Sequence, residues 1–507
     1  MTAVMSVDAR TGRAVEEVAR ESSAEEVDAA CRRAADAAAG LDALGRAGRA
    51  RMLRAMADAL EGRRDDLVRL ADRESALGEG RLGGELTRTC FQIRTFADAL
   101  DDGGYLEATI DHPGDTPMGP RPDLRRMLVP LGPVAVFGAS NFPLAFSVPG
   151  GDTASALAAG CPVVVKAHPS HPATSQVAYE ALAEGARTSG APEGTIELVH
   201  GVQAGAALVR NPAIRAVGFT GSLRGGRALF DIASSRPDPI PFYGELGSLN
   251  PLVITPAAAE ERAEEIAKGL AGSFTQGVGQ FCTKPGLVFL PQGPAGDRLR
   301  AAMTELVGEM GTNWMLNTGI RDAFQTGVRK LRDTPGVEAV AAAPGAAADA
   351  GPTAATAVLF ATTAAGLGEA DLEECFGPTT VLAAYGSEDE LFAAIDGLDG
   401  ALTATVHTGT ADTDLPAKLS ERLSGRAGRV IFNGYPTGVA VSWTQNHGGP
   451  WPATTNPLHT SVGTTAMRRF LRPLTWQDAP QSVLPPELRD GPSDVPRRVD
   501  GTLELPN

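Results

Sequence analysis

The sequence lacks what a disulfide framework, a membrane span or a nucleic-acid site would need. Its five cysteines are odd in number and far apart in 507 residues, and no pair has the spacing of a metal motif. No apolar run approaches membrane-spanning length, and the first residues lack the basic-then-apolar order of a signal peptide. A formal net charge of −16 argues against a phosphate backbone as the main partner. We therefore expect a cytoplasmic protein with no bound metal, no membrane contact and no nucleic-acid partner.

Two further scarcities concern nucleotide binding. Lysine is rare beside arginine, and only Lys166, Lys268, Lys284, Lys330 and Lys418 occur, so each lysine is slightly more informative. The glycines of "FTGSLRGG" do not form G-x-G-x-x-G, so the common dinucleotide fingerprint is absent.

What is present indicates a soluble α/β protein of two or three domains. The first hundred residues follow a helical pattern, with a capping box from Ser23 to Glu26 and Cys31 on a buried helix face. From about residue 127, short apolar runs alternate with helical stretches, which predicts parallel strands joined by helices. The Ala-rich segment 339–357 is expected to be a surface loop, and the Pro-rich tail after "PLTWQDAP" an extended or partly disordered arm. The predicted strands are 134–139, 162–167, 196–201, 216–221, 250–255, 286–291, 380–386, 402–407 and 428–434.

One cysteine stands in an unusual setting. Cys282 lies in "GVGQFCTKPG", where small and polar residues keep the backbone close on both sides. A cysteine that only fills a core usually sits on an apolar stripe, as the one at position 31 does. The setting leaves two interpretations open, a core filler or a nucleophile.

Other polar residues follow predicted strands, where ligands of parallel sheets bind. Lys166 ends one strand, and Gly221 and Ser222 form a strand-to-helix turn whose free N–H groups suit a phosphate. Glu245, in an apolar and glycine-rich segment, fits a general base with a raised pKa, and the Asn141 amide fits a donor to an oxyanion. Taken singly, each residue also fits a solvated or turn position.

Taken together, these residues resemble the aldehyde dehydrogenase superfamily over the chain from roughly residue 5 to its end. The matching pieces are "SNFPLAFSVPGGDTASALAAGCPVVVKAHPSHP", "FTGS", "ELGSLNP", "GQFCTKPG", "ECFGP" and "HGGPWPATT". The wording of "VVVKAHPSHP", "ELGSLNP" and "HGGPWPAT" is most similar to the branch of 2-oxoglutarate semialdehyde (2,5-dioxovalerate) dehydrogenases and NADP-dependent fatty aldehyde dehydrogenases.

The resemblance implies a role for each catalytic position. Cys282 would be the nucleophile that forms a thiohemiacetal and then a thioester. Asn141 and the backbone N–H of Cys282 would stabilise the oxyanion, and Glu245 would activate the hydrolytic water. The remaining cysteines, Cys90, Cys161 and Cys375, would be small apolar residues of the interior.

The same resemblance implies the cofactor and substrate contacts. The cofactor is expected to be NADP, with NAD possible, because NAD-preferring relatives often carry a glutamate where this chain has Pro169. Arg94 would bind a distal carboxylate of the substrate. The alternative is that Arg94 only forms an ion pair with Asp98, one helical turn further along. The expected cofactor contacts are Lys166, His168, Ser170, Gly221, Ser222, Gly226, Glu374 and Phe376, and the aromatic substrate walls are Phe142, Phe146, Trp443 and Trp451.

The implied fold is an α/β aldehyde dehydrogenase fold with three parts. N-terminal helices and a Rossmann-like cofactor domain would take 1–110 and 131–245, and the catalytic domain 246–445. An oligomerisation element would take 111–130 and 446–507, which gives a homodimer or homotetramer. Two rivals are a non-catalytic protein that keeps the fold and a CoA-acylating relative, and the presence of Glu245 favours water as acyl acceptor over CoA.

Overall fold

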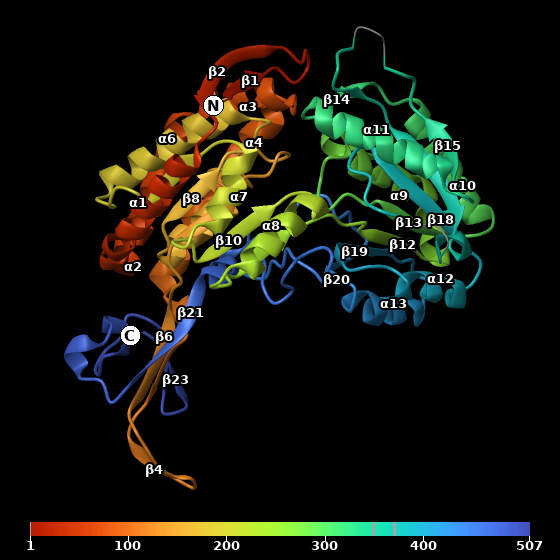
Figure 1. Ribbon diagram of the computed structural model, residues 1–507. Helices are drawn as coiled ribbons and strands as arrows, with labels where there is room; N and C mark the ends of the chain where they lie inside the picture. The colour runs from red at the N-terminus through yellow and green to blue at the C-terminus, as the bar shows by residue number, and fades with distance from the viewer. Residues whose placement is uncertain (1, 347–349, 369–371, 507) are drawn as a thin grey trace.

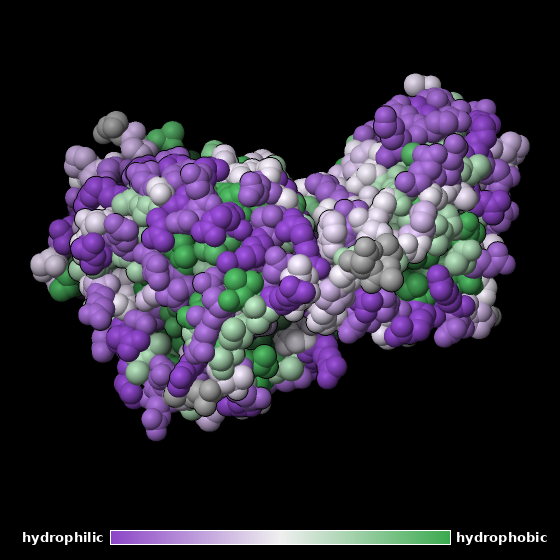
Figure 2. Space-filling view, turned by 90° about the horizontal axis from the view of Figure 1, so that it is seen from above, coloured by the Kyte–Doolittle hydropathy of each residue, from purple (hydrophilic) through white to green (hydrophobic). Residues whose placement is uncertain are grey.

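The computed structural model describes residues 2–346, 350–368 and 372–506, and its three larger sheets, of five, seven and five strands, lie in three separate bodies (Figure 1). The space-filling view from above shows two lobes joined by a narrower waist (Figure 2). Within the described residues, no helix is long and apolar enough to cross a membrane.

The N-terminal segment covers the first lobe. A hairpin of β1 and β2, which the sequence did not predict, precedes four helices. The predicted capping box is confirmed, because the Ser23 hydroxyl accepts from the Glu26 N–H and the Glu26 carboxylate accepts from the Ser23 N–H. Cys31 is fully buried, as predicted. The elements are β1 (Ala3–Val7), β2 (Ala14–Arg20), α1 (Ala24–Ala43), α2 (Gly45–Gly62), α3 (Arg64–Ser75) and α4 (Glu79–Asp102).

The sheet of the first lobe is five-stranded and parallel, in the order β11-β10-β7-β8-β9. Its strands are short and almost wholly apolar because helices cover both faces. The predicted alternation of strands and helices is therefore confirmed here. The elements are β7 (Val134–Phe137), α5 (Gly151–Ala159), β8 (Val163–Lys166), α6 (Pro172–Thr188), β9 (Ile196–Val199), α7 (Val202–Arg210), β10 (Ala216–Thr220), α8 (Leu223–Ser235) and β11 (Phe242–Glu245).

The second lobe has a seven-stranded sheet in the order β15-β17-β18-β13-β12-β19-β20. Its strands are parallel except β15, which pairs antiparallel with β17 at one edge. The elements are β12 (Pro251–Ile254), α9 (Pro256–Thr275), β13 (Leu287–Pro291), α10 (Pro294–Gly308), α11 (Thr318–Asp333), β15 (Glu338–Ala342), β17 (Val358–Thr363), β18 (Thr379–Tyr385), α12 (Glu388–Asp396), β19 (Ala401–His407), α13 (Leu415–Ser424) and β20 (Ala427–Phe432).

The Ala-rich segment differs from its expected form. Part of it is the edge strand β15, and β16 (Ala354–Ala355) pairs with β14 (Asn313–Trp314). Residues 347–349 of this segment lie outside the described residues.

A third sheet forms an arm that projects away from both lobes (Figure 1). Its strand order is β21-β6-β3-β22-β23. The C-terminal tail contributes β21, β22 and β23, so it is an ordered part of the arm. The strands are β3 (Ala108–Asp111), β6 (Leu124–Pro130), β21 (Leu471–Gln477), β22 (Arg497–Val499) and β23 (Thr502–Glu504), with the hairpin of β4 (Gly114–Thr116) and β5 (Gly119–Arg121) extending from them.

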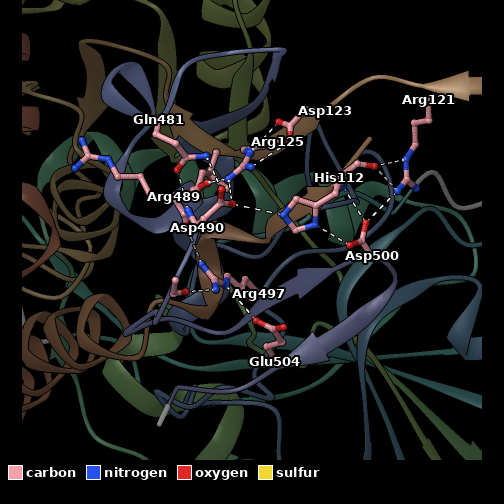
Figure 3. A network of polar contacts seen from close by, with 12 residues as sticks. His112, Arg121, Asp123, Arg125, Gln481, Arg489, Asp490, Arg497, Asp500 and Glu504 are labelled. Atoms are coloured by element: carbon pink, nitrogen blue, oxygen red, sulfur yellow. Dashed lines mark hydrogen bonds and ion pairs between the residues drawn. The ribbon is translucent and has the colours of Figure 1, made fainter. Parts of the chain in front are cut away.

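Charged side chains fasten the tail to this arm (Figure 3). The His112 ring lies 2.7 Å from Asp500 through Nδ1 and 3.5 Å from Asp490 through Nε2. Arg125 contacts Asp490 at 2.7 Å, and Arg121 contacts Asp500 at 3.0 Å. The raised pKa of His112 comes chiefly from its hydrogen bond with Asp500, with Asp490 adding to it.

One predicted domain boundary differs from the structure. Residues 446–470 do not belong to the arm, because the 3₁₀ helix η4 (Thr464–Phe470) packs on α5 in the first lobe. Met467 and Phe470 are fully buried in the core of that lobe. The arm contribution of the tail therefore starts at β21, and the segment before it returns to the space between the lobes.

Candidate active site

The carboxyl ends of the first sheet place several candidate residues together. Glu245 is the last residue of β11 and lies beside Thr220, the last residue of β10. Asn141 follows the end of β7, the central strand of the sheet. This edge of the sheet faces a cavity of about 370 Å³, and its lining residues include Asn141, Gly221, Ser222, Glu245 and Cys282. The sheet topology thus gathers residues that are far apart in the sequence.

Cys282 reaches the cavity from the second lobe, after α9. Gly277, Val278 and Gly279 all have positive φ, which turns the chain sharply before the cysteine. A Cβ on Gly279 would lie 2.1 Å from the carbonyl oxygen of Gly377, so only glycine fits there. Cys282 is the one cysteine of the chain that is not classed as buried.

Asn250 and Lys284 hold the loop that carries this cysteine. The Asn250 side chain donates to the carbonyl oxygens of Cys282 at 2.8 Å and Lys284 at 2.9 Å. The buried Lys284 ammonium donates to the carbonyls of Cys375 and Thr379. Both residues stand in the quoted pieces "ELGSLNP" and "GQFCTKPG", but sequence reasoning gave them no role.

His447 lies between the cysteine and the carboxylate. Its Nε2 atom is 3.5 Å from Cys282 Sγ and 2.9 Å from Glu245 Oε1. The Ser461 hydroxyl donates to Glu245 Oε2 at 2.7 Å. The sequence gave one signal for His447, its place in "HGGPWPATT", and no signal that this segment crosses to the first lobe.

Contrary to the expectation from the sequence, the pKa of Glu245 beside Cys282 and His447 is lowered. Burial raises the pKa of this carboxyl, but His447, Ser461 and Cys282 together lower it by more, so Glu245 is held as a carboxylate. Burial raises the pKa of the Cys282 thiol well above its usual range, and the Glu245 charge adds to that. The resting cysteine is therefore a protonated thiol that needs a base, and two bases lie beside it.

The wall of the cavity nearest α8 suits a dinucleotide. Ser222 caps α8, where its hydroxyl accepts from the Gly225 N–H, and Gly221 and Ser222 line the cavity at the start of this helix. His168, Glu374 and Phe376 also line the cavity. A Cβ on Gly247 would lie 2.6 Å from Glu374 Oε2, which shows how closely this carboxylate packs over the backbone. Burial raises the pKa of Glu374 to about 7, against the opposing effect of Lys284.

Three expected cofactor residues lie outside the lining of the cavity. Lys166 is half-buried at the end of β8, and burial lowers its pKa to about 8. The Ser170 hydroxyl accepts from the Asn317 amide at 2.6 Å, which joins the two lobes. A Cβ on Gly226 would lie 2.2 Å from Leu246 Cδ2, so this glycine allows α8 to pack against the segment after β11.

Three expected substrate residues are also elsewhere. Arg94 points to α2 and contacts Asp58 at 2.7 Å, neither lining the cavity nor pairing with Asp98. Trp443 and Trp451 are 53% and 48% exposed, and an Arg227 guanidinium lies over the Trp451 ring. None of these three side chains is among the residues that line the cavity.

The other two aromatic predictions do lie at the cavity. Phe142 and Phe146 line it, with ring centroids 5.2 Å apart. Phe281 packs edge-on against Phe142, and the Phe146 ring lies beside His447 at 6.2 Å. Two arginines missed by sequence reasoning, Arg81 and Arg88, lie over these rings.

The cavity thus brings together a half-buried thiol, a carboxylate and an amide donor, and His447 lies beside the first two. Residues 2–456 match the aldehyde dehydrogenase family. The chain is 46% identical over 485 residues to alpha-ketoglutaric semialdehyde dehydrogenase 2 of Azospirillum brasilense, which covers 94% of this chain and 92% of the relative. It is 43% identical over 464 residues to alpha-ketoglutaric semialdehyde dehydrogenase of Acinetobacter baylyi, which covers 90% of this chain and 87% of the relative.

Solved structures show the same fold at lower identity. An NADP-dependent enzyme of E. coli superposes with a TM-score of 0.80 at 22% identity, over 94% of this chain and 95% of that one. An aldehyde dehydrogenase of Pseudomonas syringae, solved with NAD⁺ and octanal, gives a TM-score of 0.78 at 22% identity, over 94% and 93% of the two chains. Because the family model matches residues 2–456 and two relatives are 46% and 43% identical over 94% and 90% of this chain, the chain belongs to the aldehyde dehydrogenase family.

Proposed function

We propose that this protein oxidises 2-oxoglutarate semialdehyde to 2-oxoglutarate, with NADP as the preferred cofactor. The observation that carries the substrate is the identity of 46% and 43% to two alpha-ketoglutaric semialdehyde dehydrogenases over at least 87% of each relative. The rival substrates are long-chain or aromatic aldehydes, which the phenylalanines at the cavity favour.

The first step is addition of Cys282 Sγ to the aldehyde carbon. The thiol proton passes to the pair formed by His447 Nε2 and Glu245 Oε1, which lie within reach of the sulfur. The Asn141 amide already donates one hydrogen to the Gln280 carbonyl, and its second hydrogen is free for the developing oxyanion. The product of this step is a thiohemiacetal on Cys282.

The chemistry that a bound nicotinamide supplies is acceptance of the hydride that leaves the thiohemiacetal carbon, which converts it to a thioester. Glu245 then takes a proton from water as the water oxygen attacks the thioester carbon. Cys282 leaves as a thiolate, and the carboxylic acid product is released. The lowered pKa of Glu245 keeps this group ionised at neutral pH, as the step requires.

The preference for NADP rests on the turn after β8. Pro169 is exposed there, where a carboxylate would repel a 2′-phosphate. Lys166 supplies a cation at the end of the strand, whereas burial lowers the pKa of His168 well below its usual value, so that ring is neutral. We expect Lys166 to carry the electrostatic contact, with His168 and Ser170 shaping the turn.

A second copy of the same chain is the proposed partner, in a dimer or tetramer. The arm presents two open sheet edges, β21 and β23, to solvent. Leu503 and Leu505 are 57% and 70% exposed beside the second edge. Open edges with exposed apolar side chains favour pairing with another chain.

The test measures absorbance at 340 nm with 2-oxoglutarate semialdehyde, hexanal and benzaldehyde, each with NAD and NADP and with or without CoA. We expect the semialdehyde to give the highest kcat/KM, NADP to be preferred, and Cys282→Ala to lose several orders of magnitude in rate. A higher value for hexanal would favour the hydrophobic-aldehyde function. A tenfold preference for NAD, about 1.4 kcal/mol, would overturn the cofactor proposal.

A further inference from the structure

Two half-buried arginines near Cys282, Glu245 and His447 form no ion pair with a carboxylate of the described residues. Arg88 lies on α4 and Arg429 on β20, and both contact the loop 436–439. The Arg88 guanidinium donates to the Val439 carbonyl at 3.4 Å, and that of Arg429 donates to the Gly438 and Pro436 carbonyls at 3.2 Å and 2.8 Å. No carboxylate oxygen of the described residues lies within 4.0 Å of either cation.

Both cations are close to the reacting sulfur. Arg88 lies 5.0 Å over the ring of Phe146, which lines the cavity with Cys282. Burial lowers the pKa of both arginines, and a charge on Cys282 raises it in each case. Arg429 is linked to Arg88 through the loop 436–439, and Arg88 lies over a ring that lines the cavity.

Neither guanidinium is fully satisfied. Arg88 Nη1 and Arg429 Nε are buried and have no hydrogen-bond partner among the described residues. Glu85 is the acidic group that faces Arg88, one helical turn earlier on α4. Its Oε1 accepts from the Leu144 and Ala145 N–H groups, and burial raises its pKa, so it compensates the arginine only in part. Leaving buried donors unpaired is costly, which favours a ligand that supplies acceptors.

We propose that Arg88 and Arg429 bind the distal carboxylate of the aldehyde substrate. This rests on the proposed function, which requires a carboxylated aldehyde, and it assigns the residues that recognise it. Arginine suits the task because its planar fork matches both oxygens of a carboxylate. A five-carbon chain is about 5 Å from end to end, at about 1.5 Å for each carbon–carbon bond, so the distal carboxylate stays close to the cysteine that holds the aldehyde.

The test uses two aldehydes of equal chain length, 5-oxopentanoate and pentanal, which differ only in the distal carboxylate. The measured quantity is the ratio of their kcat/KM values. In Arg88→Gln we expect this ratio to fall about 10- to 100-fold, since a hydrogen bond to a charged group contributes about 1.5–3 kcal/mol. Arg429→Gln should lower it in the same direction, mainly through KM, and Arg88→Lys should keep part of it.

Arg94→Ala is the matched control, because Arg94 lies on the same helix and faces Asp58 instead of the cavity. We expect it to leave the ratio unchanged. If the wild-type enzyme shows no preference for 5-oxopentanoate, the proposed substrate class fails. If the wild type has the preference and both glutamine variants retain it, the substrate class stands and this assignment is wrong. Turnover of pentanal shows that each variant is folded.

Discussion

Glu374 is the side chain of the cofactor wall whose charge changes near neutral pH. Its pKa is raised to about 7 by burial, and we expect its ionised form to accept the ribose hydroxyls. Because cofactor binding then favours the ionised form, affinity is present above pH 7 and is lost as the pH falls through this value.

This predicts that the dissociation constant of NADPH, measured by fluorescence titration, increases from pH 8 to pH 6. In Glu374→Gln the increase should be smaller, with only the titration of the cofactor phosphate remaining. An identical pH dependence in the variant and the wild type would contradict the assignment.

His447 is expected to act on both of its neighbours. It contacts Cys282 Sγ, and among the neighbours of Glu245 it contributes most to lowering the pKa of that carboxyl against the effect of burial. Without it, the pKa of Glu245 should rise, so the acidic limb of the kcat/KM profile should move to higher pH.

We therefore expect His447→Gln to lower kcat/KM by about 100-fold, the scale of a lost general base, and to shift this limb. Ser461→Ala removes only the hydrogen bond to Glu245 Oε2 and should shift the limb less, with a smaller loss of rate. A variant with an unmoved limb and a loss below twofold would show that His447 only fills space.

Sequence reasoning found the residues that resemble the family most closely and missed those that depend on the path of the chain. Cys282, Glu245 and Asn141 stand in recognisable pieces, and the structure brings them to one cavity. His447 reaches Cys282 and Glu245 only because residues 446–470 return to the first lobe, which no local pattern indicates.

At the scale of elements, the direction in which each residue of α4 points explains why Arg94 lies away from the cavity. Arg81 and Arg88 are seven residues apart, close to two helical turns, so both face the phenylalanines of the cavity. Arg94 is six residues beyond Arg88, which turns it toward α2. The sequence predicted the helix, and only the packed structure shows which of its faces meets the cavity.

At the junction of β3 with the C-terminal tail, His112 contacts Asp500 and Asp490. The hydrogen bond with Asp500, with help from Asp490, raises the pKa of His112, so its contribution to stability is complete below its unfolded pKa of about 6.5. That contribution is lost as the pH rises through the raised folded value.

We expect His112→Gln to lower the Tm at pH 6 and to change it less at pH 8.5. The effect should be small and should shrink in high salt, since His112 is partly exposed. A Tm difference that is equal at the two pH values would show that the ring acts by packing alone. Arg472→Gln, on the exposed strand β21, is a control for the loss of one arm cation.

The whole molecule is two lobes and a projecting arm, and the arm is where association should be tested. Leu503→Asp places a charge on an exposed edge strand and leaves both lobes intact. We expect light scattering after size exclusion to show a smaller assembly for this variant than for the wild type. Val202→Asp, at an exposed apolar position of the first lobe, should leave the assembly unchanged. Equal masses for Leu503→Asp and the wild type would exclude this edge as a subunit contact.

The return of residues 446–470 to the first lobe also has a consequence for how the chain is made. Domains generally begin to fold in the order in which they leave the ribosome. The first sheet with Glu245 and the loop of Cys282 can form early, but the second base beside the thiol, His447, and the hydrogen bond of Ser461 to Glu245 come late in the chain. During synthesis the Cys282 thiol therefore stays protonated, because burial raises its pKa, and its neighbours are complete only when nearly the whole polypeptide has emerged. A nascent chain that stalls before Ser461 should carry an unreactive cysteine. Cys282 should react with aldehydes only after His447 and Ser461 have reached Cys282 and Glu245.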